Sequence, residues 1–95
     1  DDCVEGIIRL MRSDYSEPLN IGSEEMISIN DLTRMVIGFS GNDLKIKNVD
    51  SKAIGVKGRN SDNKLIREVL GWEPKYPLEK GMIKTYEWIK SQYEL

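Results

Sequence analysis

The sequence predicts a small, mostly helical α/β domain whose elements follow one another in the order α-β-α-β-α-α. Apolar residues recur at helical spacing in four stretches, which predicts the four helices. Two short stretches, residues 19–22 and 44–49, have the pattern of strands. The chain of 95 residues has room for one small core, so we expect a single domain. Two strands do not easily form a sheet alone, and we expect the first to pair with chain outside these residues.

The first helix is expected over roughly residues 2–13 because apolar side chains there repeat at intervals of three and four positions. These side chains are Val4, Ile7, Ile8 and Met11. Asp1 and Asp2 supply a cap and a favourable charge at the start of this helix. The extended run of residues 19–22 follows and ends at a glycine.

A capping box from Ser28 to Asp31, with Asp in place of the usual Glu or Gln, predicts the start of the second helix. Its apolar side chains are Leu32, Met35, Val36 and Phe39. Gly38 and Gly41 mark its end. Alternation between apolar residues and lysines then predicts a half-buried strand over residues 44–49.

Two more helices complete the predicted order. An apolar face formed by residues 65, 66, 69 and 70 predicts the third helix, which Gly71 closes. Pro77 suits the first turn of the last helix. Apolar and aromatic residues recur along that helix at Leu78, Met82, Tyr86, Ile89 and Tyr93.

The composition is that of a water-soluble globular domain with 32% charged residues and a net charge of −2. No apolar run approaches the roughly 20 residues that a membrane span needs, so we expect no membrane partner. The single cysteine, Cys3, cannot form an internal disulfide, which favours a reducing, cytoplasmic location.

Charge is distributed unevenly along the chain. Residues 1–25 carry two arginines against seven carboxylates, whereas residues 45–67 carry seven basic side chains against two acidic ones. The positive middle creates a local field that suits an anionic ligand. The acidic remainder would repel a long polyanion, so we expect no nucleic-acid partner.

The centre of the positive stretch is a glycine-bearing loop that carries Lys57, Arg59 and Asp62. The guanidinium of Arg59 is a planar fork of donors that fits phosphate oxygens, and Lys57 would support the positive field. An ionised Asp62 accepts hydrogen bonds and therefore suits a sugar hydroxyl. Together these residues could hold a sugar nucleotide. The alternative is a solvated basic loop in which Asp62 merely caps the following helix.

Two Tyr-x-x-x-Lys patterns are not interpreted as a dehydrogenase acid/base pair. Tyr76 precedes a proline, so it lies before the last helix and cannot share a helix face with Lys80. Tyr86 falls on the apolar stripe of the last helix, while Lys90 can extend along the edge of that stripe.

Other side chains also have structural interpretations. Cys3 has no histidine to activate it and is expected to be a small packing residue, and the chain offers no zinc ligand set. Trp72 and Trp88 are expected to pack in a core or an interface, and the carboxylates of Glu24 and Glu25 are expected to be solvated. The sequence contains no Gly-x-Gly-x-x-Gly dinucleotide fingerprint.

Several motifs in order carry a family resemblance: Asp-Cys-Val-Glu-Gly at 2–6, Asn-Ile-Gly-Ser at 20–23, Ser-x-x-Asp-Leu at 28–32, Gly-Arg-Asn-Ser-Asp-Asn at 58–63, Leu-Gly-Trp-x-Pro at 70–74 and Leu-x-x-Gly-Met at 78–82. The chain resembles the C-terminal part of the extended short-chain dehydrogenase/reductases, the NAD-dependent epimerase/dehydratase family, that act on nucleotide sugars. Within this family it looks most similar to the 3,5-epimerases of GDP-hexoses.

The resemblance implies an isomerase that oxidises a hexose at C4, epimerises it at C3 and C5, and returns the hydride. It implies that Arg59 contacts the phosphates of a GDP-hexose, and that Asp62 lies near the nucleotide ribose. NAD would be bound by an N-terminal Rossmann domain that is absent from this chain. The catalytic residues would also lie upstream, and Cys3 does not match the family's catalytic cysteine. Residues 1–95 would then form one C-terminal substrate-binding subdomain, inactive by itself and holding no cofactor.

Three alternatives stay open at this point. The chain could come from another nucleotide-sugar enzyme of the same family, namely a UDP-hexose 4-epimerase, a dehydratase or a decarboxylase. It could be a non-catalytic interaction module that docks through residues 45–67. It could also self-associate through apolar surface that the Rossmann domain would otherwise cover.

Overall fold

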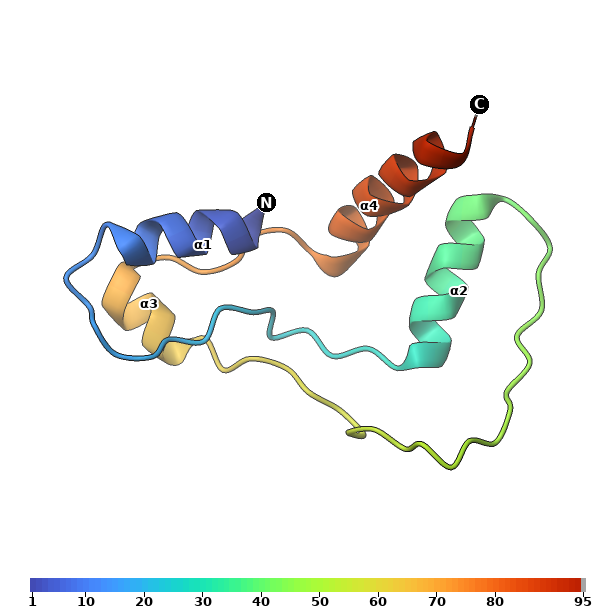
Figure 1. Ribbon diagram of the computed structural model, residues 1–95, viewed down its shortest axis with the longest axis horizontal. Coiled ribbons are helices and arrows are strands. Elements are labelled where there is room, and N and C mark those ends of the chain that lie inside the picture. Colours follow the sequence, from blue (N-terminus) through green and yellow to red (C-terminus); the bar gives the residue numbers. More distant parts are fainter. Residues whose placement is uncertain (95) are drawn as a thin grey trace. The chain divides into compact units, whose positions relative to one another are not determined.

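The computed structural model describes residues 1–94, which form four helices joined by irregular segments (Figure 1). The helices are α1 (Asp2–Met11), α2 (Ile29–Ser40), α3 (Lys64–Leu70) and α4 (Leu78–Tyr93). All four correspond to the helices predicted from apolar spacing. The chain is therefore mostly helical, as expected.

The two predicted strands are wrong, because no strand occurs anywhere in residues 1–94. Residues 19–22 and 44–49 adopt irregular backbone instead. A strand exists only where a neighbouring strand satisfies its backbone N–H and C=O groups, and alternation along one segment cannot supply that neighbour. The second of these segments is largely exposed, with Leu44 and Val49 in solvent.

The ends of α2 and α3 follow the sequence signals, whereas the predicted side-chain cap of α1 is wrong, because Asp1 at its N-cap makes no side-chain cap hydrogen bond. The Ser28 hydroxyl accepts a hydrogen bond from the Asp31 N–H at 3.0 Å, which is half of the predicted capping box. The Asp31 carboxylate pairs with Arg34 at 2.6 Å. Gly41 and Gly71 end α2 and α3 in the left-handed region, with φ of 68° and 59°, where glycine has no steric penalty.

The chain divides into two compact units that we describe separately. One unit combines Asp1–Met26 with Arg59–Tyr76 and contains α1 and α3. The other combines Ile27–Gly58 with the chain from Pro77 onward and contains α2 and α4. The expectation that residues 1–95 form a single domain stays a prediction.

The first unit packs around Ile66 and Trp72, which are 1% and 5% exposed. Trp72 lies against Gly6 of α1 so closely that a Cβ at that position would be 2.9 Å from the indole ring. The Arg9 guanidinium lies over the same indole at 5.9 Å from the ring centroid. The Asp2 carboxylate accepts the backbone N–H groups of residues 75 and 76, at 3.0 and 2.8 Å, and so ties the 71–76 segment to α1.

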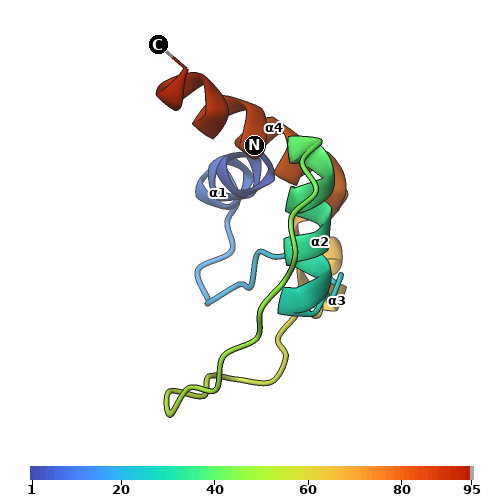
Figure 2. The same cartoon turned by 90° about the vertical axis from the view of Figure 1, so that its right-hand side faces the viewer.

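The second unit consists of α2 packed on α4, which lie side by side in Figure 2, together with a long exposed loop. Phe39 and Tyr86 meet across the two helices with ring centroids 5.9 Å apart. Tyr86 therefore packs on the apolar stripe, as expected. Pro77 lies at the N-cap of α4, one residue before the first turn that the sequence suggested. Trp88 is 64% exposed, so it does not pack in a core among residues 1–94, and its packing in an interface stays a prediction.

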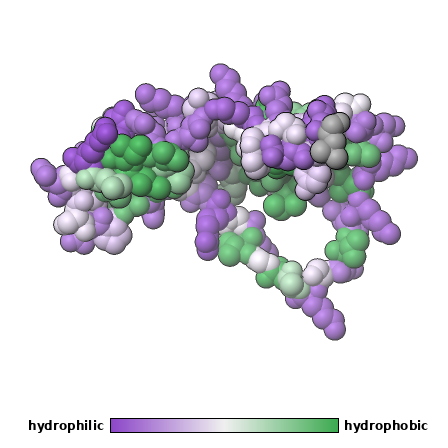
Figure 3. All heavy atoms as spheres, turned by 45° about the horizontal axis from the view of Figure 1, so that its top comes forward, coloured by the Kyte–Doolittle hydropathy of each residue, from purple (hydrophilic) through white to green (hydrophobic). Residues whose placement is uncertain are grey.

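Much apolar surface is exposed to solvent (Figure 3). The predicted stripe of α1 is one example, since Met11 at its end is 79% exposed. Cys3 is also exposed, so it does not act as a small packing residue here. Among residues 1–94 no helix has both the length and the apolar character needed to cross a membrane.

Candidate functional site

A cavity of about 480 Å³ lies in the first unit, where two extended segments run next to each other. Its walls are formed by residues 20–23, Glu25 and residues 59–61. The lining thus combines a guanidinium, a carboxylate, an amide and hydroxyl groups with the apolar side chain of Ile21. A guanidinium beside hydroxyl and amide groups can bind a small polar anion.

Backbone and amide groups hold the two segments together although they form no regular strand. The Ser61 N–H donates to the Ser23 carbonyl at 2.8 Å. The Asn60 side-chain amide donates to the Glu24 carbonyl at 2.9 Å. Gly22 permits this close approach, because a Cβ there would lie 3.1 Å from the Cβ of Ser61. The cavity walls are therefore fixed by direct contacts between the segments.

Asn63 is the buried anchor of this arrangement, with 3% of its surface exposed. Its side-chain amide donates to the Gly22 carbonyl at 2.9 Å, and its Oδ1 accepts from the Ser61 hydroxyl at 2.7 Å. Its backbone N–H donates to Glu24 Oε1 at 3.1 Å. Each of these polar groups has a partner, as buried polar groups require.

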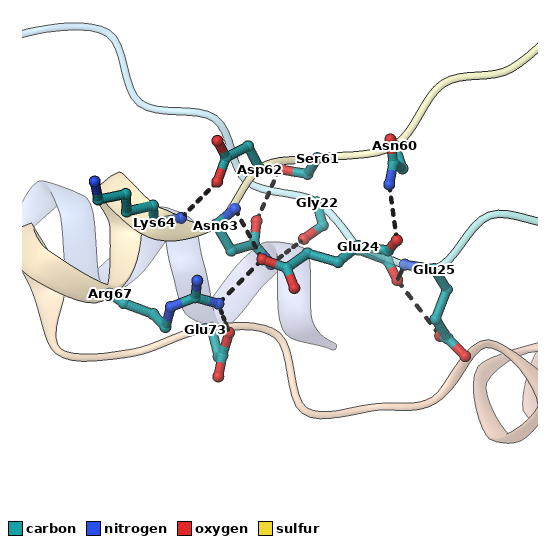
Figure 4. A network of polar contacts seen from close by, with 11 residues as sticks. Gly22, Glu24, Glu25, Asn60, Ser61, Asp62, Asn63, Lys64, Arg67 and Glu73 are labelled. Carbon is teal, nitrogen blue, oxygen red and sulfur yellow. Dashed lines mark hydrogen bonds and ion pairs between the residues drawn. The ribbon is translucent and has the colours of Figure 1, made fainter.

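Charged side chains extend the network outward from Asn63 (Figure 4). The same Glu24 oxygen accepts from Arg67 Nη1 at 3.0 Å, and Arg67 also pairs with Glu73 at 2.8 Å. Hydrogen bonds to Glu73 and then to Glu24 raise the pKa of Arg67, which favours its charged form. These side chains are about half exposed, and the ion pairs serve orientation more than stability.

Arg59 is exposed and lines the cavity. Across residues 1–94 its guanidinium forms no ion pair or hydrogen bond, in contrast to Arg67. Its planar set of donors is thus available to an anion that enters the cavity.

The other two predicted site residues lie outside the lining of this cavity. Asp62 Oδ1 accepts the backbone N–H of Lys64 at 3.1 Å, but the N-cap of α3 is Asn63, so Asp62 supports the start of α3 without being its cap. Its ribose contact stays a prediction. Lys57 is exposed in the loop of the second unit, and its support of the positive field also stays a prediction.

Glu24 and Asn63 were missed as site-forming residues by the sequence-based interpretation. The pair of acidic residues at positions 24 and 25 suggested solvated charges, yet Glu24 binds partners 39 and 43 positions away in the sequence. A local sequence pattern cannot indicate contacts between residues so far apart in the sequence. The one available signal was the pair of asparagines at positions 60 and 63, since an amide can bond to backbone in place of a strand neighbour.

The described residues contain no cluster of metal-ligating side chains and no glycine-rich turn between a strand and a helix. Within residues 1–94 no group of three or more His, Cys, Asp or Glu side chains is placed to hold a metal ion. A dinucleotide cradle needs a glycine-rich turn between a strand and a helix. Gly55 and Gly58 instead lie in an exposed loop with irregular backbone on both sides.

A second cavity of about 550 Å³ lies in the same unit between α1 and α3. Arg9 and Arg12 line it, and the Arg9 guanidinium is bonded to Glu5 at 2.8 Å and lies over the indole of Trp72. The first cavity differs in that its guanidinium, that of Arg59, lies beside the hydroxyl and amide groups of Ser23, Asn60 and Ser61, and it is therefore the candidate for a nucleotide ligand.

No family model matches the chain. The curated relatives of the chain are enzymes named for nucleotide sugars, among them epimerases, decarboxylases and a fucose synthase. The chain is 51% identical over 94 residues to GDP-mannose 3,5-epimerase of Arabidopsis thaliana. It is 37% identical over 81 residues to UDP-glucuronic acid decarboxylase 6 of the same plant, and 37% identical over 93 residues to probable GDP-L-fucose synthase 1 of Oryza sativa subsp. japonica.

These alignments cover 99%, 85% and 93% of the chain, respectively. The chain spans only about a quarter of the length of these relatives, at 25%, 24% and 27%. The predicted resemblance to nucleotide-sugar enzymes, with the stronger similarity to GDP-mannose 3,5-epimerase, is confirmed by these identities.

Proposed function

We propose that this chain is the substrate-binding part of an NAD-dependent nucleotide-sugar epimerase similar to GDP-mannose 3,5-epimerase. The observation that carries the proposal is Arg59, whose unpaired guanidinium lines the cavity between the 20–25 and 59–61 segments. The 51% identity to GDP-mannose 3,5-epimerase supports the choice of a GDP-hexose as ligand.

The chemistry of the ligand matches the cavity. A nucleotide diphosphate sugar presents two adjacent anionic phosphates, and a guanidinium can donate two parallel hydrogen bonds to such oxygens. The hydroxyls of Ser23 and Ser61 and the amide of Asn60 add neutral hydrogen-bonding groups in the same cavity. Lys57 would strengthen the attraction for phosphate, and Asp62 would accept a hydrogen bond from the ribose.

The redox chemistry would be supplied from outside these residues. By the resemblance to the epimerase, NAD and the catalytic side chains would belong to a Rossmann portion of the complete polypeptide. The role of residues 1–95 would be to grip and orient the substrate against that portion, since catalysis requires all the reacting groups in one geometry. By itself this chain would not turn over substrate. Its cytoplasmic location stays a prediction from the single cysteine.

Binding specificity tests the proposal against the related enzymes. GDP-mannose and UDP-glucose would each be titrated calorimetrically into the complete polypeptide that contains these residues. We expect GDP-mannose to bind at least about tenfold more tightly, a difference of roughly 1.4 kcal/mol. Tighter binding of UDP-glucose would assign the chain to a decarboxylase or 4-epimerase instead.

Self-association of the isolated chain is a second proposal. The apolar stripe of α1 is exposed in residues 1–94 at Val4, Ile7, Ile8 and Met11. An apolar face of this kind favours contact between copies when nothing else covers it.

A further inference from the structure

We propose that Glu24 is a positioning residue for Arg59: its carboxylate holds the 59–63 segment against the 20–24 segment and thereby fixes where the guanidinium lies in the cavity. The inference rests on the proposed function, because it assigns Glu24 a part in phosphate binding. It concerns a side chain that does not itself line the cavity.

Glu24 contacts both ends of the short stretch that follows Arg59. Its backbone carbonyl accepts the side-chain amide of Asn60 at 2.9 Å, directly next to Arg59 in the sequence. Its Oε1 accepts the backbone N–H of Asn63 at 3.1 Å, at the point where the segment enters α3. One residue thus restrains the segment at two places three positions apart.

The carboxylate of Glu24 is itself held in place by a cation. Arg67 donates to the same oxygen from α3 at 3.0 Å and is in turn anchored by Glu73 at 2.8 Å (Figure 4). The restraint on the 59–63 segment therefore includes an ion pair between Glu24 and Arg67 of α3. Charge-assisted hydrogen bonds are stronger and more directional than neutral ones.

The buried side chain of Asn63 makes this restraint effective. Its amide is bonded to the Gly22 carbonyl at 2.9 Å, and its Oδ1 is bonded to Ser61 at 2.7 Å. Loss of the Glu24 carboxylate would leave the backbone N–H of Asn63 without its acceptor. The segment would then shift, and Arg59 would move with it, although Arg59 itself touches none of these groups.

A double-mutant cycle in the complete polypeptide tests the proposal with GDP-mannose as the titrated ligand. Glu24→Ala should weaken GDP-mannose binding about fivefold, which is within the range of coupling between residues of one network. In the Arg59→Ala background the same substitution should change the affinity less than about twofold, since no guanidinium is left to position. A purely structural role would weaken binding equally in both backgrounds, and that result would overturn the proposal.

Two further variants test whether the loss of affinity is specific to the contacts of the Glu24 carboxylate. Arg67→Gln disturbs the Glu24 carboxylate from its other side and should also weaken GDP-mannose binding, whereas unchanged affinity would contradict the proposal. Glu68→Ala removes a neighbouring exposed carboxylate of α3 and should leave the affinity unchanged.

The affinity of Arg59→Ala alone shows whether the inference about Glu24 or the proposed function itself is wrong. Unchanged affinity in Arg59→Ala alone would overturn both, because the positioned group would bind nothing. A loss in Arg59→Ala without a loss in Glu24→Ala would overturn only the role of Glu24.

Discussion

Asn63 and Asp62 are neighbours in the sequence and have opposite environments. Asn63 is buried and bonds to both segments that form the cavity, whereas Asp62 is exposed and bonds to the start of α3. The run Gly-Arg-Asn-Ser-Asp-Asn at 58–63 therefore combines a side chain that builds the site with one that begins the next helix. Neighbouring polar residues of one motif therefore have different structural roles, because their hydrogen-bond partners differ.

The two roles considered for Asp62 predict different effects of substitution. Asp62→Asn keeps an oxygen that can accept the Lys64 N–H, so the free energy of unfolding should stay within about 0.5 kcal/mol of the wild type. Asp62→Ala should lower it by about 0.5–1.5 kcal/mol, because the hydrogen bond from the Lys64 N–H is lost. Chemical denaturation followed by circular dichroism measures both values.

Calorimetric titration of Asp62→Asn with GDP-mannose decides the ribose contact. Weakened binding with stability retained would support that contact. Unchanged affinity would leave Asp62 with the helix-start role alone.

At the level of elements, the helices were predictable because their signals are local. The apolar spacing of α1, the Ser28 cap of α2 and the left-handed glycine after α3 each lie within one or two turns of the helix they define. The strands were not predictable, because pairing depends on a partner far away in the sequence. Residues 20–23 do find a neighbour, at residues 59–61, but asparagine side chains replace much of the ladder.

The candidate site was predictable in part for the same reason. Arg59 was identified from its own chemistry and from the loop around it, both of which are local. The second wall of the cavity and the contacts of Glu24 depend on residues about 40 positions away, and no periodicity encodes them. The close approach of Gly22 to Ser61 likewise depends on a tertiary contact that the local sequence does not indicate.

Substituting Gly6 and Gly38 by alanine should change the free energy of unfolding in opposite directions, because only Gly6 packs against Trp72. Gly6→Ala places a Cβ 2.9 Å from the indole and should lower the free energy of unfolding by about 1–3 kcal/mol through overpacking. Gly38→Ala, also inside a helix, meets no atom within 4 Å and should raise it by up to about 1 kcal/mol through helix propensity. Equal effects of both changes in thermal or urea unfolding would contradict this packing.

At the scale of the whole molecule, apolar area is left in contact with water on both units. Only Ile66 and Trp72 are fully buried apolar side chains in the described part of the chain. A small chain with so little core is expected to be marginally stable by itself. The exposed apolar residues of α1 are therefore a surface that could be buried by contact with another chain.

Self-association should show in sedimentation velocity of the isolated chain. The sedimentation coefficient should rise with concentration, and a Met11→Lys change in the apolar stripe should reduce that rise. Ile54→Lys, in the exposed loop of the second unit, serves as the matched control and should have a smaller effect. A coefficient that is independent of concentration would show that the stripe does not bring copies together.

The affinity of Arg59→Ala for GDP-mannose, measured by calorimetry in the complete polypeptide, tests the central claim most directly. Lys80→Ala is the control, since it removes an exposed positive charge that does not line the cavity. We expect Arg59→Ala to weaken binding by at least about 1.5 kcal/mol, roughly 12-fold, and Lys80→Ala to leave it unchanged. An affinity of Arg59→Ala within about twofold of the wild type, a difference of roughly 0.4 kcal/mol, would contradict the claim that this guanidinium grips the diphosphate.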